Sequence, residues 1–236
     1  MKPAGPDVSA RSAGPSRWGS GAEHRTALLL GASAWLVQPL YIAAELAAAA
    51  ASSAPYSALD QTISDLGATS CTSIDYPYGP VDVCSPWHPL VNTSFVVFGV
   101  LLALGALLLR RFLPRPRLAM ASTALWVIAG LSSVATGFVP VDRDLAGHSL
   151  VALPSLVAMP IALVLLAAGL GRTSRRLAAA TATVGLASLA GSVIFLATSM
   201  SPELGGVWER LSFWPTYLWL PVVATVLLRR NRATHT

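Results

Sequence analysis

The chain has 236 residues, only 11% of them are charged, and its mean hydropathy is +0.60. A soluble domain carries about a quarter charged residues, so this composition excludes an ordinary soluble enzyme. The pI is near 9.8, but the basic residues sit in small clusters beside apolar blocks, without the basic groove and aromatic platforms of a nucleic-acid-binding protein. We therefore expect a membrane protein whose main partner is the lipid bilayer, with no nucleic-acid partner.

Residues 1–25 are rich in Pro, Gly, Ser and Arg and lack apolar periodicity, which predicts a disordered tail. Six apolar blocks follow in the 26–230 domain, each about long enough for a helix to cross roughly 30 Å of hydrocarbon. These blocks are 26–51, 89–109, 118–139, 149–170, 177–199 and 213–228, and a short tail at 231–236 ends the chain. The predicted fold class is all-α: a polytopic membrane protein of three antiparallel helical hairpins, with a long loop at 52–88. The first block could also be a signal peptide, but its apolar stretch is about twice as long as an h-region, so we expect an anchored helix.

The arginines indicate the orientation. They cluster before the first block, between the second and third, between the fourth and fifth, and after the sixth. Only Arg143 and Arg210 of the 16 lysines and arginines fall in the opposite loops. The positive-inside rule then places both termini in the cytoplasm of a cell whose plasma membrane holds the protein.

Cys71 and Cys84 are the only cysteines, and both lie in the long outer loop. Because the space outside the membrane is oxidising, we expect them to form a disulfide rather than a metal site.

An internal repeat is visible when the chain is shifted by 61 residues, which superimposes the second and third hairpins. The matched pairs include Arg111 with Arg172, Arg115 with Arg176, Ala129-Gly130 with Ala190-Gly191, Asp142 with Glu203, His148 with Glu209, Pro154 with Pro215, and Pro160 with Pro221. Both hairpins start from the same side, so the pattern predicts a parallel repeat about an axis along the membrane normal. Glu203 and Glu209 are then the repeat-related partners of Asp142 and His148.

Glu45 is an acidic residue inside the first block, where a carboxylate costs a few kcal/mol on insertion scales. Gln38, Tyr41 and Glu45 share one helical face, so this stripe should point into the bundle. Pro39 predicts a kink with a freed carbonyl. Glu45 could carry function, for example as a proton carrier, or could only fix helix packing through hydrogen bonds.

Several polar residues are expected near the outer surface. His88 and Asn92 lie one turn apart on the second block, His148 begins the fourth, and Asp65 and Asp142 lie in the preceding outer loops. Two histidines with carboxylates could form an acid–base pair or a zinc site made by His88, His148 and Asp142. No HExxH, His-x3-His or Gly-x-Ser-x-Gly pattern is present, so we predict no cofactor, with zinc as the alternative.

Three segments carry a family resemblance: Tyr56-Ser57 followed by Ile63-Ser64-Asp65-Leu66-Gly67; Asn92-Thr93-Ser94-Phe95 leading to Gly99; and Gly137-Phe138-Val139-Pro140-Val141-Asp142 with His148. They resemble domain-of-unknown-function family 998, prokaryotic multi-helix membrane proteins without an established general activity. The resemblance covers about residues 26–230. It implies that Ser64, Asp65, Asn92, Asp142 and His148 occupy the family's recurrent polar positions, and that the cysteine-bearing segment is an insertion. The Ile-Ser-Asp segment also has a fainter likeness to Frag1/DRAM membrane proteins.

The leading functional hypothesis is an outward-facing polar pocket for a small molecule or lipid headgroup. Its candidate residues are Glu45, Ser64, Asp65, His88, Asn92, Asp142 and His148. The alternatives are a membrane-embedded metal-assisted hydrolase or lipid-modifying enzyme, a small transporter or transporter subunit, and a structural membrane component without a ligand.

Overall fold

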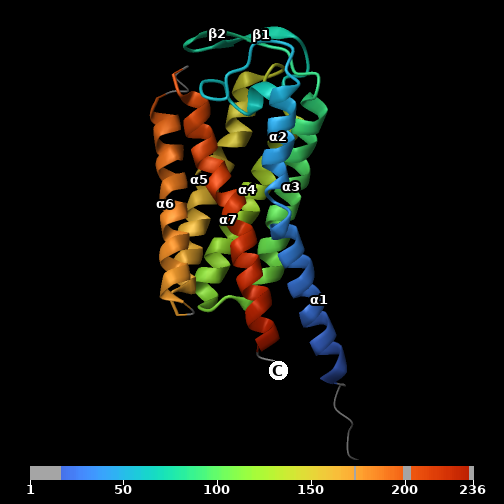
Figure 1. Cartoon of the computed structure of the whole chain (residues 1–236), viewed down its shortest axis with the longest axis vertical. Coiled ribbons are helices and arrows are strands. Elements are labelled where there is room, and N and C mark those ends of the chain that lie inside the picture. Colours follow the sequence, from blue (N-terminus) through green and yellow to red (C-terminus); the bar gives the residue numbers. More distant parts are fainter. Residues whose placement is uncertain (1–16, 173, 199–202, 234–236) are drawn as a thin grey trace, which may run out of the picture.

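The computed structural model describes residues 17–172, 174–198 and 203–233 as an elongated helical bundle with a two-stranded sheet at one end (Figure 1). The helices are α1 Arg17–Leu36, α2 Leu40–Ala50, α3 His88–Leu109, α4 Pro116–Phe138, α5 Leu145–Leu170, α6 Arg175–Ala197 and α7 Gly205–Ala233. Strands β1 Thr72–Tyr76 and β2 Gly79–Val83 pair antiparallel, and short 3-10 helices cover Ser64–Gly67 and Arg110–Phe112.

Six helical stretches are long and apolar enough to cross a membrane, which confirms the predicted number of spans. They are Ala22–Ala50, His88–Phe112, Pro116–Phe138, Leu145–Leu170, Arg175–Ala197 and Gly205–Asn231. The predicted tails at 1–25 and 231–236 fall partly outside the described residues, and α1 already covers 17–25.

The sixth span is longer than predicted, because α7 begins at Gly205 rather than near residue 213. Glu209 and Arg210 look like loop residues in the sequence, but both are buried in the first turns of this helix. Arg210 pairs there with Glu45, so its charge is neutralised inside the bundle. A charge that is paired in this way does not end a span.

The first span is broken at Pro39, as the sequence predicts, and continues as α2. The Gln38 amide donates to the carbonyl oxygen of Ala34 at 3.2 Å and to that of Phe98 at 3.4 Å. A side chain therefore satisfies a carbonyl that the broken helix releases, which is how a kink is tolerated in lipid. Gln38, Tyr41 and Glu45 are all buried, so the predicted inward stripe is confirmed.

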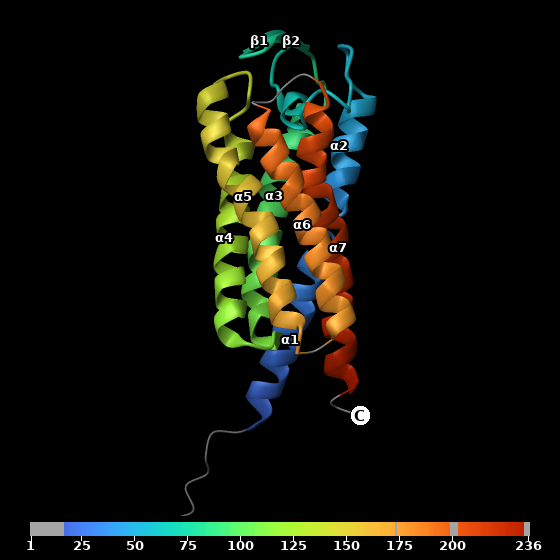
Figure 2. The same ribbon diagram turned by 90° about the vertical axis from the view of Figure 1, so that its left-hand side faces the viewer.

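The helices pack in chain order around the bundle: α3 lies against α4, α4 against α5, α5 against α6, and α6 against α7. The α1 helix contacts both α3 and α7, and this contact closes the ring (Figures 1 and 2). Gly99 and Gly130 bring α3 and α4 close together, because a Cβ on either glycine would meet the other's carbonyl oxygen within 2.6 Å. Small residues at such contacts are a common device of membrane helices.

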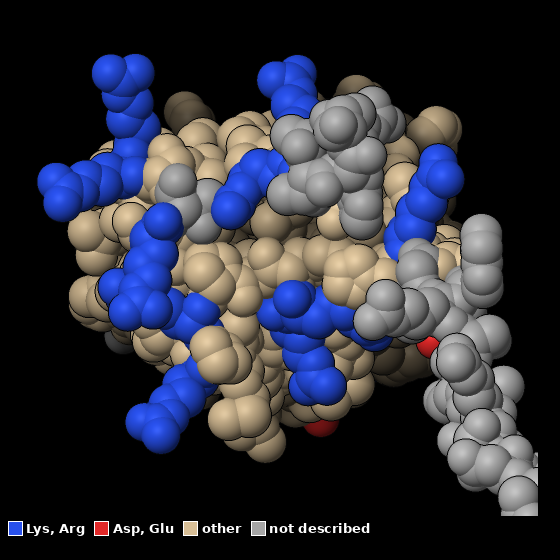
Figure 3. Space-filling view, turned by 90° about the horizontal axis from the view of Figure 1, so that it is seen from below, with Lys and Arg blue, Asp and Glu red and all other residues tan. Residues whose placement is uncertain are grey.

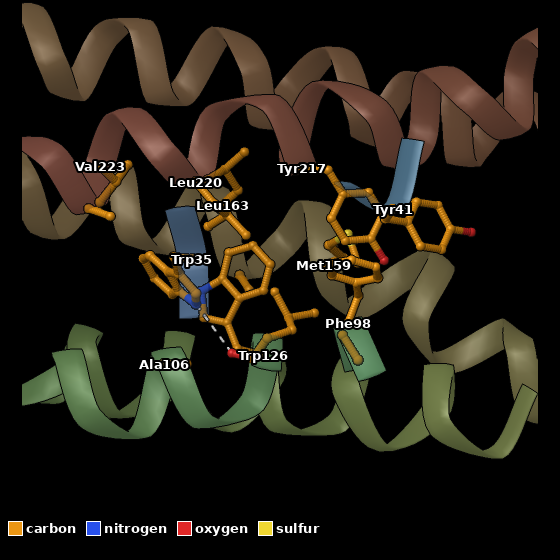
Figure 4. Close-up of a cluster of buried hydrophobic side chains, with 14 of the residues drawn as sticks. Trp35, Tyr41, Phe98, Ala106, Trp126, Met159, Leu163, Tyr217, Leu220 and Val223 are labelled. Carbon is orange, nitrogen blue, oxygen red and sulfur yellow. Dashed lines mark hydrogen bonds between the residues drawn. The ribbon is translucent and has the colours of Figure 1, made fainter. Parts of the chain in front are cut away.

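The core contains aromatic and aliphatic side chains from α1, α2, α3, α4, α5 and α7 (Figure 4). The Trp35 indole donates to the carbonyl oxygen of Leu102 at 3.3 Å and packs edge-on against Trp126. Tyr41 stacks on Tyr217 with 4.5 Å between the ring centroids. These contacts join the two halves of the first span to the rest of the bundle.

The all-α prediction needs one correction, the β1–β2 hairpin inside the 52–88 loop. Cys71 and Cys84 form the predicted disulfide at the open end of the hairpin, next to the pair Thr72 and Val83. Ile74, Tyr76 and Val83 are buried in a small cluster with Ala68 and Val141. A disulfide and a small apolar cluster give a short two-stranded sheet the support that it lacks alone.

We call the end that carries β1 and β2 the hairpin end and the opposite one the arginine end. Seen from the arginine end, the surface shows many basic and few acidic side chains (Figure 3). The basic residues in the loops and helix termini there are Arg110, Arg111, Arg115, Arg117, Arg172, Arg175, Arg176, Arg229 and Arg230. The structure therefore confirms that charge is separated along the bundle.

Candidate functional site

The 62–70 segment, which follows the first span, is held by side chains from distant parts of the chain. Asp65 fixes the start of its 3-10 helix by accepting from the Thr62 amide at 2.8 Å, and the Tyr76 hydroxyl donates to Asp65 at 2.6 Å. Burial raises the pKa of the Asp65 carboxyl, while these hydrogen bonds act in the opposite direction. Asp65 is thus a buried anchor between the 62–70 segment and the hairpin.

Asn92 and Asp142 hold the later part of the same segment. The Asn92 amide donates to the carbonyl oxygen of Gly67 at 2.9 Å. Asp142 accepts from the backbone amides of Thr69 at 2.9 Å and Ser70 at 3.1 Å, and from both of their hydroxyls. Partial burial opposes ionisation of Asp142, but these hydrogen bonds outweigh it and lower the pKa of the carboxyl.

His148, in the first turn of α5, bridges two loops. Its Nδ1 lies 2.6 Å from the carbonyl oxygen of Val139, and its Nε2 lies 2.8 Å from Oγ of Ser64. A carbonyl oxygen can only accept, so Nδ1 carries the proton, and Nε2 of the neutral ring accepts from the Ser64 hydroxyl. The N-cap residue Asp144 accepts from the Gly147 amide at 2.8 Å and fixes the turn that presents the imidazole.

Ser64 and His148 both line a cavity of about 520 Å³ at the hairpin end. Its polar lining is Thr62, Ser64, Tyr76, His148, Ser149 and Glu209. The rest of the wall is apolar and comes from Pro77, Val141, Leu145, Ala146, Leu150, Ala152, Leu153, Leu156, Phe195, Leu196 and Phe213. An apolar cavity with a few convergent polar groups is the usual form of a small-molecule site.

Glu209 enters this cavity from the first turns of α7 and is only 7% exposed. Its Oε2 accepts from the backbone amide of Ile63 at 2.6 Å. Ser64, the next residue, therefore follows two fixed amides, because Asp65 holds that of Thr62. The polar end of the cavity is consequently well ordered.

Glu45 is an ion-pair partner and does not line the cavity. Its Oε1 accepts from Nε of Arg210 at 2.9 Å, and its Oε2 accepts from the Trp214 indole at 2.8 Å. Arg210 also donates through Nη1 to three backbone carbonyls and through Nη2 to the Tyr56 hydroxyl. With both carboxylate oxygens occupied, Glu45 fits the packing role better than that of a proton carrier.

Two further residues that the sequence suggested, His88 and Glu203, do not line the cavity. His88, the first residue of α3, contacts the carbonyl oxygen of Ser85 through Nδ1 at 2.9 Å, and Glu203 is exposed before α7. Within the described residues, no three His, Cys, Asp or Glu side chains come together as metal ligands. The zinc alternative built on His88, His148 and Asp142 therefore gains no geometric support.

Sequence reasoning missed Arg210 as a buried residue and did not single out Thr62 or Tyr76. A signal for Arg210 was available, because it is one of two basic residues on the acid-rich side of the chain. A basic residue inside a membrane-spanning helix needs a partner, and Glu45 was the buried acid available. For Thr62 and Tyr76 no such signal exists, since their contacts depend on how the loop folds.

A comparison with protein-family models matches residues 26–226 to a family described as "Protein of unknown function (DUF998)". No curated protein and no solved structure matches the chain. The likeness to Frag1/DRAM proteins has no support in these comparisons.

Proposed function

The chain belongs to the DUF998 family of proteins of unknown function, and we propose that it binds a lipid-like amphiphile in the cavity at its hairpin end. The observation that carries the proposal is the position of the cavity at the junction between polar loops and apolar helices. Its polar groups come from the 62–70 segment, β1 and the first turns of α5 and α7, and most of its apolar wall comes from α5 and α6. A molecule with a polar head and a hydrocarbon chain matches this division.

The apolar wall reaches the outer surface of the bundle. Leu150, Leu153 and Leu196 line the cavity, yet they are 71%, 42% and 44% exposed. All three lie within membrane-spanning helices, so these exposed faces meet lipid rather than water. A chain could therefore enter sideways from the bilayer while its head binds at Ser64, His148 and Glu209.

We further propose that the hairpin end lies outside the plasma membrane and that both termini are cytoplasmic. The arginines at the opposite end favour this orientation through the positive-inside rule. The Cys71–Cys84 disulfide supports it independently, because structural disulfides persist in oxidising surroundings. The cavity would then open in the outer leaflet.

The predicted parallel repeat is kept as part of this proposal. It pairs His148 with Glu209, and both residues line the same cavity. It also pairs Pro154 with Pro215, and both prolines lie inside helices, α5 and α7. A ligand site between repeat-related helices is common among membrane proteins built from repeats.

Native mass spectrometry of the detergent-purified protein with added 1-dodecanol tests the proposal. We expect one bound molecule on the wild type and loss of binding in Ala152→Phe, because the larger ring fills the cavity. The matched control is Val157→Phe, on the same helix but outside the cavity lining, which should bind normally. Equal binding by both variants, or none by the wild type, would refute the proposal.

A second candidate function, acyl transfer to or from a lipid ester, is favoured by the Ser64–His148 hydrogen bond. A serine hydroxyl that donates to a histidine held by a third group is the arrangement of an activated nucleophile. Asp65 directly follows Ser64 and Glu209 binds the Ile63 amide, however, and carboxylates this close oppose the oxyanion that such a reaction forms. We rank binding first; covalent labelling by a fluorophosphonate that disappears in Ser64→Ala would reverse the order.

A further inference from the structure

The charges around the cavity are unbalanced. Arg210 is the one basic side chain that forms an ion pair in the membrane-spanning part of the described chain, and its partner is Glu45. The other donors of its guanidinium are directed at backbone carbonyls and at Tyr56. Glu209, its neighbour in sequence, takes part in neither of the two salt bridges formed by the described residues.

Glu209 therefore presents a carboxyl to the cavity whose one hydrogen-bond donor among the described residues is the Ile63 amide. The nearest cation, Arg210, is already paired with Glu45, and a buried carboxylate that shares its cation with another acid is costly in an apolar setting. A bound cation would reduce that cost. Asp65 adds a second carboxyl close to the polar end, since it contacts Tyr76 and Thr62, which both line the cavity. The cavity thus favours a positively charged head group over a neutral or negative one.

We propose that the amphiphile bound in this cavity carries a protonated amine, which pairs with the carboxylate of Glu209. This inference rests on the proposed function and specifies the class of its ligand. An ammonium group has three hydrogen-bond donors and no acceptor, so it needs a site rich in acceptors. Glu209 supplies carboxylate oxygens, and Ser64 keeps lone pairs for accepting because its own proton is directed at His148.

The aromatic lining supports the same class of ligand. Tyr76, Phe195 and Phe213 contribute aromatic rings to the lining of the cavity. Ring faces attract ammonium ions through cation–π interactions, which strengthen when water is excluded. An anionic head such as a fatty acid carboxylate would instead meet Glu209 as a like charge.

Four probes with the same dodecyl chain separate the head groups: dodecylamine, dodecyltrimethylammonium, 1-dodecanol and dodecanoate. Their affinities for the full-length protein are measured by titration in native mass spectrometry at pH 7. We expect dodecylamine to bind about tenfold more tightly than 1-dodecanol, as one charge-assisted hydrogen bond contributes. Dodecyltrimethylammonium, which keeps the charge without the donors, should lie between them, and dodecanoate should bind most weakly.

Equal affinities for the amine and the alcohol would overturn this inference and leave the amphiphile site intact, whereas no binding by any probe would overturn both proposals. The comparison needs only the wild type, so it does not depend on whether a variant folds.

The role of Glu209 is tested with Glu209→Gln. This variant should bind the amine and the alcohol within about twofold of each other, because the charge is lost and the shape is kept. The matched control is Glu203→Gln, an exposed residue just before the same helix that does not line the cavity. It should retain the wild-type preference; an unchanged preference in Glu209→Gln would overturn the assignment.

A protonated amine with an attached chain can come from a lipid head group or from a free alkylamine. The two sources are separated by repeating the dodecylamine titration in nanodiscs. If phosphatidylethanolamine is the source, nanodiscs containing it should weaken dodecylamine binding relative to phosphatidylcholine alone, and equal binding in both identifies a free amine. If dodecylamine binds no more tightly than 1-dodecanol in either kind of nanodisc, the proposal is overturned.

Discussion

Arg210 on α7 donates through Nε to Oε1 of Glu45 on α2 at 2.9 Å, and both side chains are buried. Through its remaining donors, Arg210 also holds the carbonyls of Ala58, Gln61 and Gly206. One side chain therefore links the broken first span, the last span and the loop that leads to the cavity. Glu209 beside it takes part in neither salt bridge of the described residues and accepts from the Ile63 amide instead.

Breaking this pair should strongly destabilise the protein. Arg210→Ala leaves a buried carboxylate without its counter-ion, and we expect a loss of about 3–5 kcal/mol in the free energy of unfolding. Tryptophan fluorescence during denaturation in detergent measures it. The control is Arg143→Ala, since Arg143 is 66% exposed and lies 3.8 Å from Asp142. A 3.8 Å contact from an exposed arginine contributes at most about 1 kcal/mol, so similar losses in both variants would contradict this role.

Asp142 should make stability depend on pH in the acid range. Hydrogen bonds from Thr69 and Ser70 lower the pKa of the Asp142 carboxyl in the folded state. Its stabilising effect is therefore fully present above the unfolded-state pKa of about 3.9. That effect is lost as pH falls through the folded-state pKa. The wild type should therefore lose more thermal stability than Asp142→Asn between about pH 5 and pH 3. Melting curves at several pH values measure this, and parallel curves for the two proteins would refute it.

Gly67 and Asn92 should be energetically coupled. A Cβ on Gly67 would lie 2.5 Å from Oδ1 of Asn92, and the Asn92 amide donates to the Gly67 carbonyl. Gly67→Ala should cost about 1–3 kcal/mol, since the added methyl displaces the amide. In an Asn92→Ala background the same substitution should cost clearly less, because the clashing group is gone. A double-mutant cycle measures the coupling, and additive costs would show that the two residues act separately.

Hydropathy alone predicted the six spans, since a helix that crosses lipid must be apolar along most of its length. It failed at Glu209 and Arg210, where a local charge count suggested a loop although a partner far away in the chain neutralises the arginine. Pro39 was read correctly because a missing amide acts locally. The β1–β2 hairpin was missed because its stability depends on a disulfide and on contacts with Val141.

The polar positions were recognised as a group but their roles were not. The sequence suggested that Asp65, Asn92, Asp142 and His148 would meet. The structure places the last three against the 62–70 segment, to which Asp65 itself belongs. Only His148 of these four lines the cavity. Whether a polar side chain binds backbone or faces a cavity depends on rotamers and loop path, which periodicity does not encode.

The orientation can be tested by the accessibility of single cysteines in intact cells. In Cys84→Ser the Cys71 thiol is free, and a membrane-impermeant maleimide should label it without permeabilisation if the hairpin end is outside. The comparison is Arg111→Cys, at the exposed arginine end, made in a background where Cys71 and Cys84 are both replaced by serine. This variant should be labelled only after the membrane is permeabilised, because the positive-inside rule keeps that end in the cytoplasm. The reverse pattern would place the cavity in the inner leaflet and would require its ligand to be sought among cytoplasmic amines.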